Sequence, residues 1–285
     1  MIKSLQIQRT YKNIPEFNLY KPNNINEVSK FLGKFGENCN FMAGGVDLLQ
    51  DLKLGLKIDN LIYLKSVPEL NAIKMVDDTI RVGACVTHRS FEINPIINKF
   101  LPSLAKEWSN VGNIRIRVVG TIGGNILTND PNYDVTPALA ALNSVAHYSH
   151  INGSDRIPVI ELNRKRPPGF LTAIEIPIRN NLAFSMNRAL KPYVNLAISA
   201  TVDSDSIQEI RVGIGCAFST PLLIGLTDIL NISALNLKEQ VIKIAHEFID
   251  KLPNPIDDVF ASASYRRRMI GVLLADQILF LAGRK

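Results

Sequence analysis

The chain has 285 residues, of which 46% are apolar and 20% are charged. This composition is that of a globular protein and excludes a disordered, collagen-like or coiled-coil chain. Because single cores stop growing at about 250–300 residues, we expect two or three packed domains. The net charge of +6 would suit nucleic acid only if the basic residues formed a stripe, and they are spread along the chain instead.

The basic residues are densest at positions 164–166 and 266–268. Such short runs are typical of a solvated turn or helix, and they would equally suit a docking surface for an acidic partner subunit. We therefore predict no nucleic-acid partner.

The sequence shows neither a membrane span nor an export signal. Residues 269–283 form the longest apolar stretch, but Asp276 and Gln277 interrupt it, and a span needs roughly 20 apolar residues. Residues 1–20 include charges such as Lys12 and lack the apolar core of a secretory signal. We expect a buried helix at 269–283 and a cytoplasmic protein.

The three cysteines, Cys39, Cys85 and Cys216, are odd in number and far apart. They form neither a disulfide framework nor a paired metal motif. Any iron–sulfur chemistry would then belong to another chain.

The first part of the chain is predicted to be a small α/β unit. Apolar residues recur at helical spacing over 25–35, a short strand covers 40–43, and a second helix covers 46–56. Gly44 and Gly45 separate that strand from the second helix. We place a domain boundary near residue 58.

The middle of the chain alternates short strands and helices up to a second boundary near residue 179. Strands are predicted at 60–64, 79–83, 145–149, 157–159 and 171–178, and helices at 101–111 and 137–142. Beyond it, strands are predicted at 182–184, 195–202 and 207–214, with a turn at 203–205. Helices follow at 237–251, with Asn236 as N-cap, and at 262–281.

Two glycine-rich turns, at residues 43–47 and 120–125, are the most informative features. Glycine accepts positive φ and has no Cβ, so successive N–H groups can point at an anion. The first turn also opens a helix, whose N-terminus favours phosphate. Together the turns would suit the two phosphates of a dinucleotide, although a single Gly-Gly pair is more often an ordinary tight turn. Neither matches GxGxxG or the P-loop, and Gly213 and Gly215 are interpreted as a strand end.

The histidines give little support for metal or hydrolase chemistry. His147 and His150 lie three apart in a predicted strand, which sends them to opposite faces. His88 follows Thr87 in a loop and would be able to touch a ligand, while His246 lies in a helical pattern. A GxSxG elbow is also missing.

Residues 115–125, followed by Asp130-Pro131 and Asp134, resemble the signature of a known family. It is the FAD-binding medium subunit of the molybdenum hydroxylases, which include carbon monoxide, xanthine, nicotine and aldehyde dehydrogenases. Residues 43–49, 81–88, 171–177 and 261–266 resemble further family segments in the same order. The resemblance covers nearly the whole chain.

The resemblance implies an α+β fold. A two-part FAD-binding domain of the vanillyl-alcohol-oxidase (PCMH) type would cover residues 1–58 and 59–179. A C-terminal domain of the CO dehydrogenase flavoprotein type, with a small antiparallel sheet and helices, would cover 180–285.

The resemblance also implies roles for particular residues. The two glycine turns would wrap the FAD pyrophosphate, Asp134 would bond ribityl or ribose hydroxyls, and Leu171 would lie against the isoalloxazine. Asp134 is alternatively a helix N-cap. The implied cofactor-binding residues are Ala43, Gly44, Gly45, Val46, Asp47, Leu48, Thr87, His88, Gly120, Thr121, Gly123, Gly124, Asn125, Asp134, Leu171 and Asn187.

Two positions depart from the family pattern. Val46 stands where Thr, His or Gln is usual, so backbone donors would have to replace one side-chain hydrogen bond to the phosphates. Asn187, with Arg188 beside it, stands where many members carry a lysine near the flavin. A cation there stabilises reduced flavin, so its replacement bears on the redox potential.

The implied function is electron transfer, with no catalytic residue and no metal in this chain. Electrons would pass from a small [2Fe–2S] subunit into FAD and on to an external acceptor, and a large molybdopterin subunit would oxidise the substrate. The complex would be a dimer of heterotrimers. Two alternatives stay open: a flavin-free scaffold subunit of the same complex, and a free-standing flavin oxidase of related fold.

Overall fold

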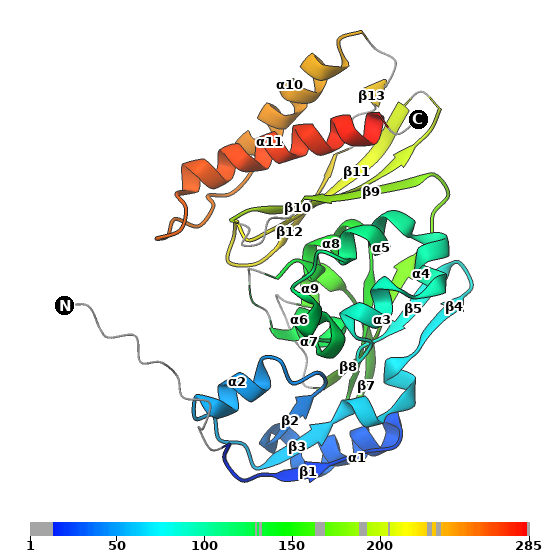
Figure 1. The fold of residues 1–285 in the computed structure, drawn as a ribbon, viewed down its shortest axis with the longest axis vertical. Coiled ribbons are helices and arrows are strands. Elements are labelled where there is room, and N and C mark those ends of the chain that lie inside the picture. The colour runs from blue at the N-terminus through cyan, green and yellow to red at the C-terminus, as the bar shows by residue number, and fades with distance from the viewer. Residues whose placement is uncertain are drawn as a thin grey trace, which may run out of the picture.

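The computed structural model describes residues 14–128, 130, 133–162, 169–187, 193–204, 206–226, 230–231 and 235–283. Several positions discussed above therefore lie outside the described residues: 1–13, Pro131, 164–166, Arg188 and Asp205. The described residues build three sheets that follow one another along the long axis of the molecule, from the N-terminal part at one end to the C-terminal helices at the other (Figure 1).

The first sheet is parallel, with the strand order β1-β3-β2. Its strands are β1 (Asn18–Tyr20), β2 (Cys39–Met42) and β3 (Asn60–Tyr63). Helix α1 (Ile25–Phe35) begins where predicted, because the Asn24 side chain accepts the Glu27 N–H at 2.9 Å. Helix α2 (Leu48–Lys53) is shorter than predicted, since Gly55 takes a φ of 106° just beyond its end.

The second sheet is antiparallel, with the order β4-β5-β8-β6-β7. Its strands are β4 (Ile73–Val76), β5 (Thr79–Gly83), β6 (Val145–His150), β7 (Gly153–Pro158) and β8 (Phe170–Pro177). Alternate residues of β5 and β8, such as Ile80 and Ile174, point into a core that also holds Phe91 and Trp108. The strand predicted at 157–159 is partly wrong, because Val159 already begins helix α9 (Val159–Leu162).

Short helices fill the connections around these sheets. They are α3 (His88–Glu92), α4 (Pro95–Phe100), α5 (Pro102–Trp108), α6 (Ile114–Val119), α7 (Ile122–Thr128) and α8 (Val135–Ala141), with 3₁₀ turns at Gly36–Asn38, Leu64–Ser66 and Pro68–Asn71. The predicted turn at 120–125 is partly wrong, since Gly123 and Gly124 lie inside α7. The Thr121 hydroxyl accepts the Gly124 N–H at 3.1 Å, which closes the first turn of that helix.

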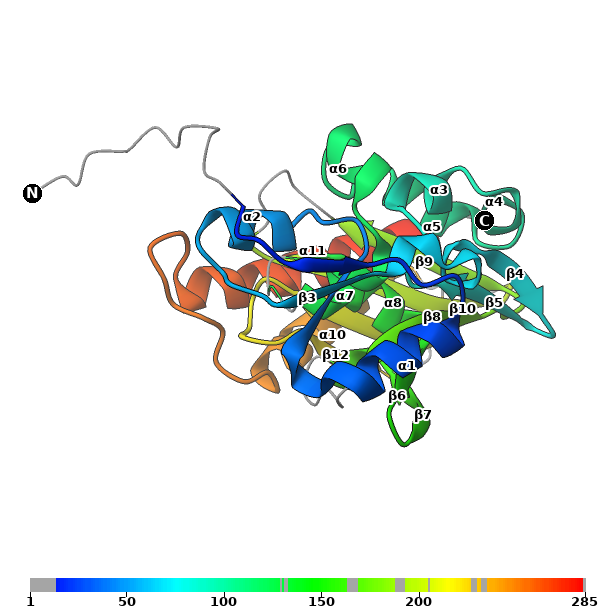
Figure 2. The same cartoon turned by 90° about the horizontal axis from the view of Figure 1, so that it is seen from below.

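The third sheet is antiparallel, with the order β12-β11-β10-β9 and with β13 paired to β11. Its strands are β9 (Leu182–Asn187), β10 (Asn195–Val202), β11 (Ser206–Gly215), β12 (Leu222–Leu226) and β13 (Leu230–Asn231). Helices α10 (Leu237–Asp250) and α11 (Ala263–Ala282) cover one face, and α8 packs on the other (Figures 1 and 2). Asn236 precedes α10 but its side chain makes no capping bond.

Residues 269–283 form most of α11, as expected of a buried helix. Ile270, Leu274 and Ile278 are fully buried against the third sheet. Within the described ranges, no helix combines the length and apolarity needed to cross a membrane.

Candidate functional site

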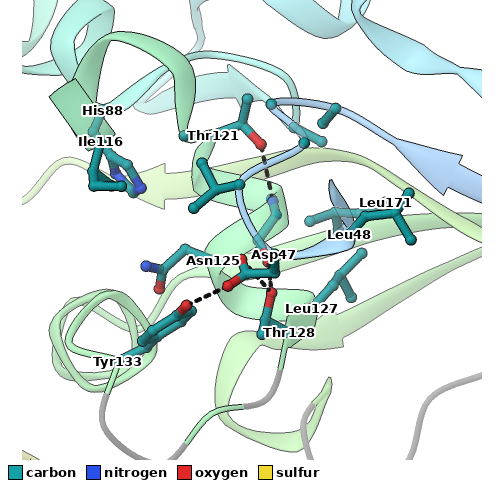
Figure 3. Close-up of a pocket in the computed structure, with 18 of the residues that line it drawn as sticks. Asp47, Leu48, His88, Ile116, Thr121, Asn125, Leu127, Thr128, Tyr133 and Leu171 are labelled. Carbon is teal, nitrogen blue, oxygen red and sulfur yellow. Dashed lines mark hydrogen bonds between the residues drawn. The ribbon is translucent and has the colours of Figure 1, made fainter. Parts of the chain in front are cut away.

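A cavity of about 970 Å³ lies where the three sheets meet the connections between them. Its volume is near the upper end of the range typical of ligand sites. Of the residues predicted from the sequence, all but Thr87 and Asn187 line it, and several of them appear in Figure 3. Those that line it are Ala43, Gly44, Gly45, Val46, Asp47, Leu48, His88, Gly120, Thr121, Gly123, Gly124, Asn125, Asp134 and Leu171.

The two glycine-rich connections touch each other beside this cavity. A Cβ on Gly44 would collide with the carbonyl oxygen of Val119, and a Cβ on Gly123 would lie 2.7 Å from the carbonyl oxygen of Ala84. Gly45 has a φ of 74°, which favours glycine. These glycines are therefore needed for the chain to pack. At Gly124, by contrast, the one described atom that a Cβ would meet within 4 Å is the Thr121 hydroxyl oxygen, at 2.9 Å.

Asp47 ties the two connections together through its carboxylate. It accepts the Tyr133 phenol hydroxyl at 2.6 Å and the Thr128 hydroxyl at 3.2 Å (Figure 3). Burial and the neighbouring Asp47 carboxylate raise the pKa of Tyr133 above its ordinary value, so the phenol stays protonated as a donor. Sequence reasoning missed Tyr133 and Thr128, although Tyr133 stands directly before Asp134 in the family signature.

Asp134 stands at the N-cap position of α8, but its side chain makes no capping bond. The carboxylate is only 2% exposed and accepts a hydrogen bond from the Asn195 amide of β10. The N-cap interpretation is therefore wrong for the side chain. Asp134 instead joins α8 to the third sheet while it borders the cavity.

Asn125 provides a buried acceptor at the cavity. Its Oδ1 has no hydrogen-bond partner among the described residues, and Asn125 lines the cavity. A buried amide oxygen without a partner is unfavourable by about 1–3 kcal/mol. A ligand hydroxyl or N–H at this position would remove that penalty.

Thr87 and Asn187 lie outside the lining of this cavity. The Thr87 hydroxyl accepts the Ser90 N–H at 3.0 Å and caps α3. Asn187 is exposed at the end of β9, opposite Leu196. His88, directly after Thr87, is buried and does line the cavity, with its ring 6.0 Å from that of Trp108.

The C-terminal part of the chain supplies a wall of the cavity that sequence reasoning missed. We call it the C-terminal wall, and it consists of Tyr193, Cys216, Ile256, Asp258, Phe260 and Arg266. The rings of Tyr193 and Phe260 stack with centroids 6.5 Å apart. Arg266 is only 3% exposed, so the interpretation of residues 266–268 as a solvated run is wrong for this residue. The sequence feature that could have identified Arg266 is its place in the segment 261–266, which resembles the family.

The structure places the two histidines of β6 beside different carboxylates. His147 contacts Glu175, whereas His150 contacts Asp155. The three cysteines are free thiols. Among the described residues, no group of three or more His, Cys, Asp or Glu side chains is arranged to hold a metal ion.

Comparison with known proteins identifies relatives of this chain. Residues 15–179 match the family model described as the FAD binding domain in molybdopterin dehydrogenase. The glyceraldehyde dehydrogenase medium chain of Sulfolobus acidocaldarius is 24% identical, over 91% of this chain and 96% of its own length. The nicotine 6-hydroxylase medium subunit of Paenarthrobacter nicotinovorans is 25% identical, over 95% of this chain and 99% of its own length.

Solved structures share the α+β fold. A carbon monoxide dehydrogenase chain from Hydrogenophaga pseudoflava superposes with a TM-score of 0.80 at 22% identity, covering 93% of this chain and 96% of that one. A quinoline 2-oxidoreductase chain from Pseudomonas putida 86 gives 0.81 at 20% identity, covering 95% and 98%. Because the family match spans more than half of the sequence and includes both glycine-rich connections, the protein belongs to the FAD-binding subunits of the molybdopterin dehydrogenases, a family of oxidoreductases.

Proposed function

We propose that the cavity binds one FAD and that the chain is the electron-transferring medium subunit of a molybdenum hydroxylase. The observation that carries the proposal is the convergence of both glycine-rich connections, β8 and the C-terminal wall on one cavity. That cavity lies in a chain whose residues 15–179 match an FAD-binding family.

The lining residues fit the parts of FAD. Backbone N–H groups of residues 43–48 would hold the pyrophosphate, since the Val46 side chain has no donor to offer. Residues 120–125 would border it, because the N–H groups of Gly120 and of residues 122–125 already donate within the protein. Asn125 Oδ1 and the Asp134 carboxylate would accept hydroxyl groups of the ribityl chain or ribose. The buried Leu171 side chain would lie against the isoalloxazine. Bound FAD would supply the redox chemistry, and the protein would supply its position and electrostatics.

We infer the partners and the domain plan from the family. A small [2Fe–2S] subunit would deliver electrons, a large molybdopterin subunit would oxidise the substrate, and the complex would be a dimer of heterotrimers. The subunit names of the relatives, "medium chain" and "medium subunit", support a multi-subunit complex. We propose the two-part PCMH-type FAD domain and a C-terminal domain from residue 180. We place the boundary between the two parts of the FAD domain beyond β3 rather than near residue 58, because β3 pairs with both β1 and β2.

The first test is to release and quantify the chromophore of the purified protein after acid denaturation. We expect close to one FAD per chain. FMN would contradict a site with two connections for a pyrophosphate. A folded protein without any flavin would favour the scaffold alternative.

A second test examines electron flow. The flavin is expected to be reduced by the organic substrate only when the partner subunits are present. Reduction by that substrate in the isolated chain would identify a free-standing oxidase instead.

A further inference from the structure

One guanidinium group, that of Arg266, lies buried in the C-terminal wall. Arg266 Nη1 donates to the carbonyl oxygens of Tyr193 at 2.5 Å and of Cys216 at 2.7 Å. Nη2 forms an ion pair of 2.7 Å with Asp258 Oδ2. One side chain thus connects three separate segments that all border the cavity.

These contacts fix the shape of the wall. Asp258 accepts the backbone N–H groups of Phe260 at 2.9 Å and Ala261 at 3.0 Å, which orders the segment that carries the Phe260 ring. Cys216 has a φ of 63°, a conformation that a side-chain-bearing residue adopts only when its surroundings hold it there. Arg266 binds its carbonyl oxygen and helps to hold it.

The described part of the chain does not fully use the hydrogen-bonding capacity and charge of Arg266. Its Nε–H is buried and has no partner among the described residues. The Asp258 carboxylate, which faces the guanidinium, is 34% exposed, so water weakens its compensation of the positive charge. A buried cation that borders a cavity and keeps an unused N–H would be satisfied by an electron-rich group in that cavity.

We propose that Arg266 supplies the positive charge that stabilises the reduced flavin of bound FAD, and that it positions the C-terminal wall against that flavin. The inference rests on the proposed function. Two features favour a position of Arg266 beside the flavin ring of FAD rather than beside its diphosphate. The stacked Tyr193 and Phe260 rings in the same wall suit a planar ring system. The first glycine-rich connection, at residues 43–48, would already provide backbone donors for the diphosphate.

The test compares Arg266→Gln with Arg266→Lys in the full chain within its complex. The FAD dissociation constant and the midpoint potential of the flavin are measured for each. Arg266→Gln is expected to lower the affinity for reduced FAD, relative to that for oxidised FAD, about tenfold. The midpoint potential of a two-electron couple then falls by about 30 mV. Arg266→Lys keeps the positive charge but loses the paired N–H donors of the guanidinium group. Its midpoint potential is expected to stay close to the wild-type value, while it binds FAD more weakly.

Asp258→Asn provides the opposite change, because it removes the compensating carboxylate and leaves Arg266 in place. It is expected to raise the midpoint potential, which a purely structural role would not do. It also keeps the inference testable if Arg266→Gln does not fold. An unchanged potential in Arg266→Gln, or in Asp258→Asn, overturns the proposal.

A weaker affinity for ADP in Arg266→Gln, with an unchanged potential, would instead assign the charge to the diphosphate and also overturn it. The wild-type FAD content tests the proposed function separately. One FAD per chain with no potential shift in the variants rejects only the role of Arg266.

Discussion

The glycines beside the cavity are required for different reasons. Gly44, Gly120 and Gly123 have backbone atoms of the protein where a Cβ would stand, so the fold itself excludes a side chain. A Cβ on Gly124 would instead meet the Thr121 side-chain hydroxyl, and no backbone atom of the described residues. Substitutions at Gly44, Gly120 and Gly123 therefore test folding. Among these four glycines, a substitution at Gly124 is the one that tests cofactor binding apart from folding.

Gly124→Val is expected to lose most bound FAD while the chain stays folded, because its branched side chain would take space beside the pyrophosphate. The measurements are FAD content after gel filtration and the circular dichroism melt. Gly123→Val is the matched comparison, and it is expected to lower the melting temperature itself. A Gly124→Val protein with full FAD content would refute the placement of the pyrophosphate.

Asp134→Ala is expected to weaken FAD binding by about tenfold to a hundredfold. This is the loss of one charge-assisted hydrogen bond at about 1.5–3 kcal/mol. Because Asp134 also binds Asn195, Asn195→Ala serves as the control that removes the contact with the third sheet but keeps the carboxylate. Equal losses of FAD affinity in the two variants, measured by fluorescence titration, would show that Asp134 acts through that contact.

Elements differed in how well the sequence predicted them. The helices at 25–35, 237–251 and 262–281 were predicted nearly to their ends, because long amphipathic or apolar patterns dominate local propensity. Sequence reasoning missed β1, β12 and β13, which are too short or too uniformly apolar to show alternation. It also missed α6 and α7, where glycines and branched residues hide a helical pattern that tertiary contacts stabilise.

A close contact between elements predicts the effect of Gly213→Ala. A Cβ on Gly213 of β11 would collide with the carbonyl oxygen of Pro137 in α8, so the sheet and the helix would have to separate. We expect a loss of about 1–3 kcal/mol in the free energy of unfolding, measured in urea. Gly225→Ala on the neighbouring strand β12 has open space around it and is expected to change stability little.

An ion cluster across four strands of the second sheet predicts a pH dependence. Glu175 of β8, which is 13% exposed, contacts Arg81 of β5, His147 of β6 and Arg156 of β7. Burial alone would raise its pKa, but the hydrogen bond with His147 and the charges of its partners hold the pKa below its ordinary value of 4.5. The carboxylate therefore stabilises the fold above that value and stops doing so as the pH falls through the lowered pKa.

Glu175→Gln is expected to unfold at lower urea concentration than the wild type at pH 6. The difference between the two proteins is expected to shrink below about pH 4, where the wild-type carboxylate becomes protonated. A difference that stays constant from pH 6 to pH 3 would show that the charge of Glu175 does not contribute.

At the scale of the whole molecule, the sequence predicted one side of the cavity and missed the other. The glycine-rich connections have local motifs and were found. The C-terminal wall combines Tyr193, Cys216 and Phe260 from three loops with Arg266 from the start of α11, and no spacing along the sequence brings such residues together. Only the tertiary fold places these loops beside Gly124 and Asp134.

Because the cavity is lined by residues from both ends of the chain, a ligand bound in it contacts both ends and holds them together. Ala43 and Arg266 border the same space although most of the sequence separates them. A ligand that binds only the folded state adds about 2.7 kcal/mol to the free energy of unfolding at a hundred times its dissociation constant. The flavin-free protein is therefore expected to melt earlier, by differential scanning calorimetry, and to be cut faster by proteases. Flavin supply would then set how long each newly made chain survives.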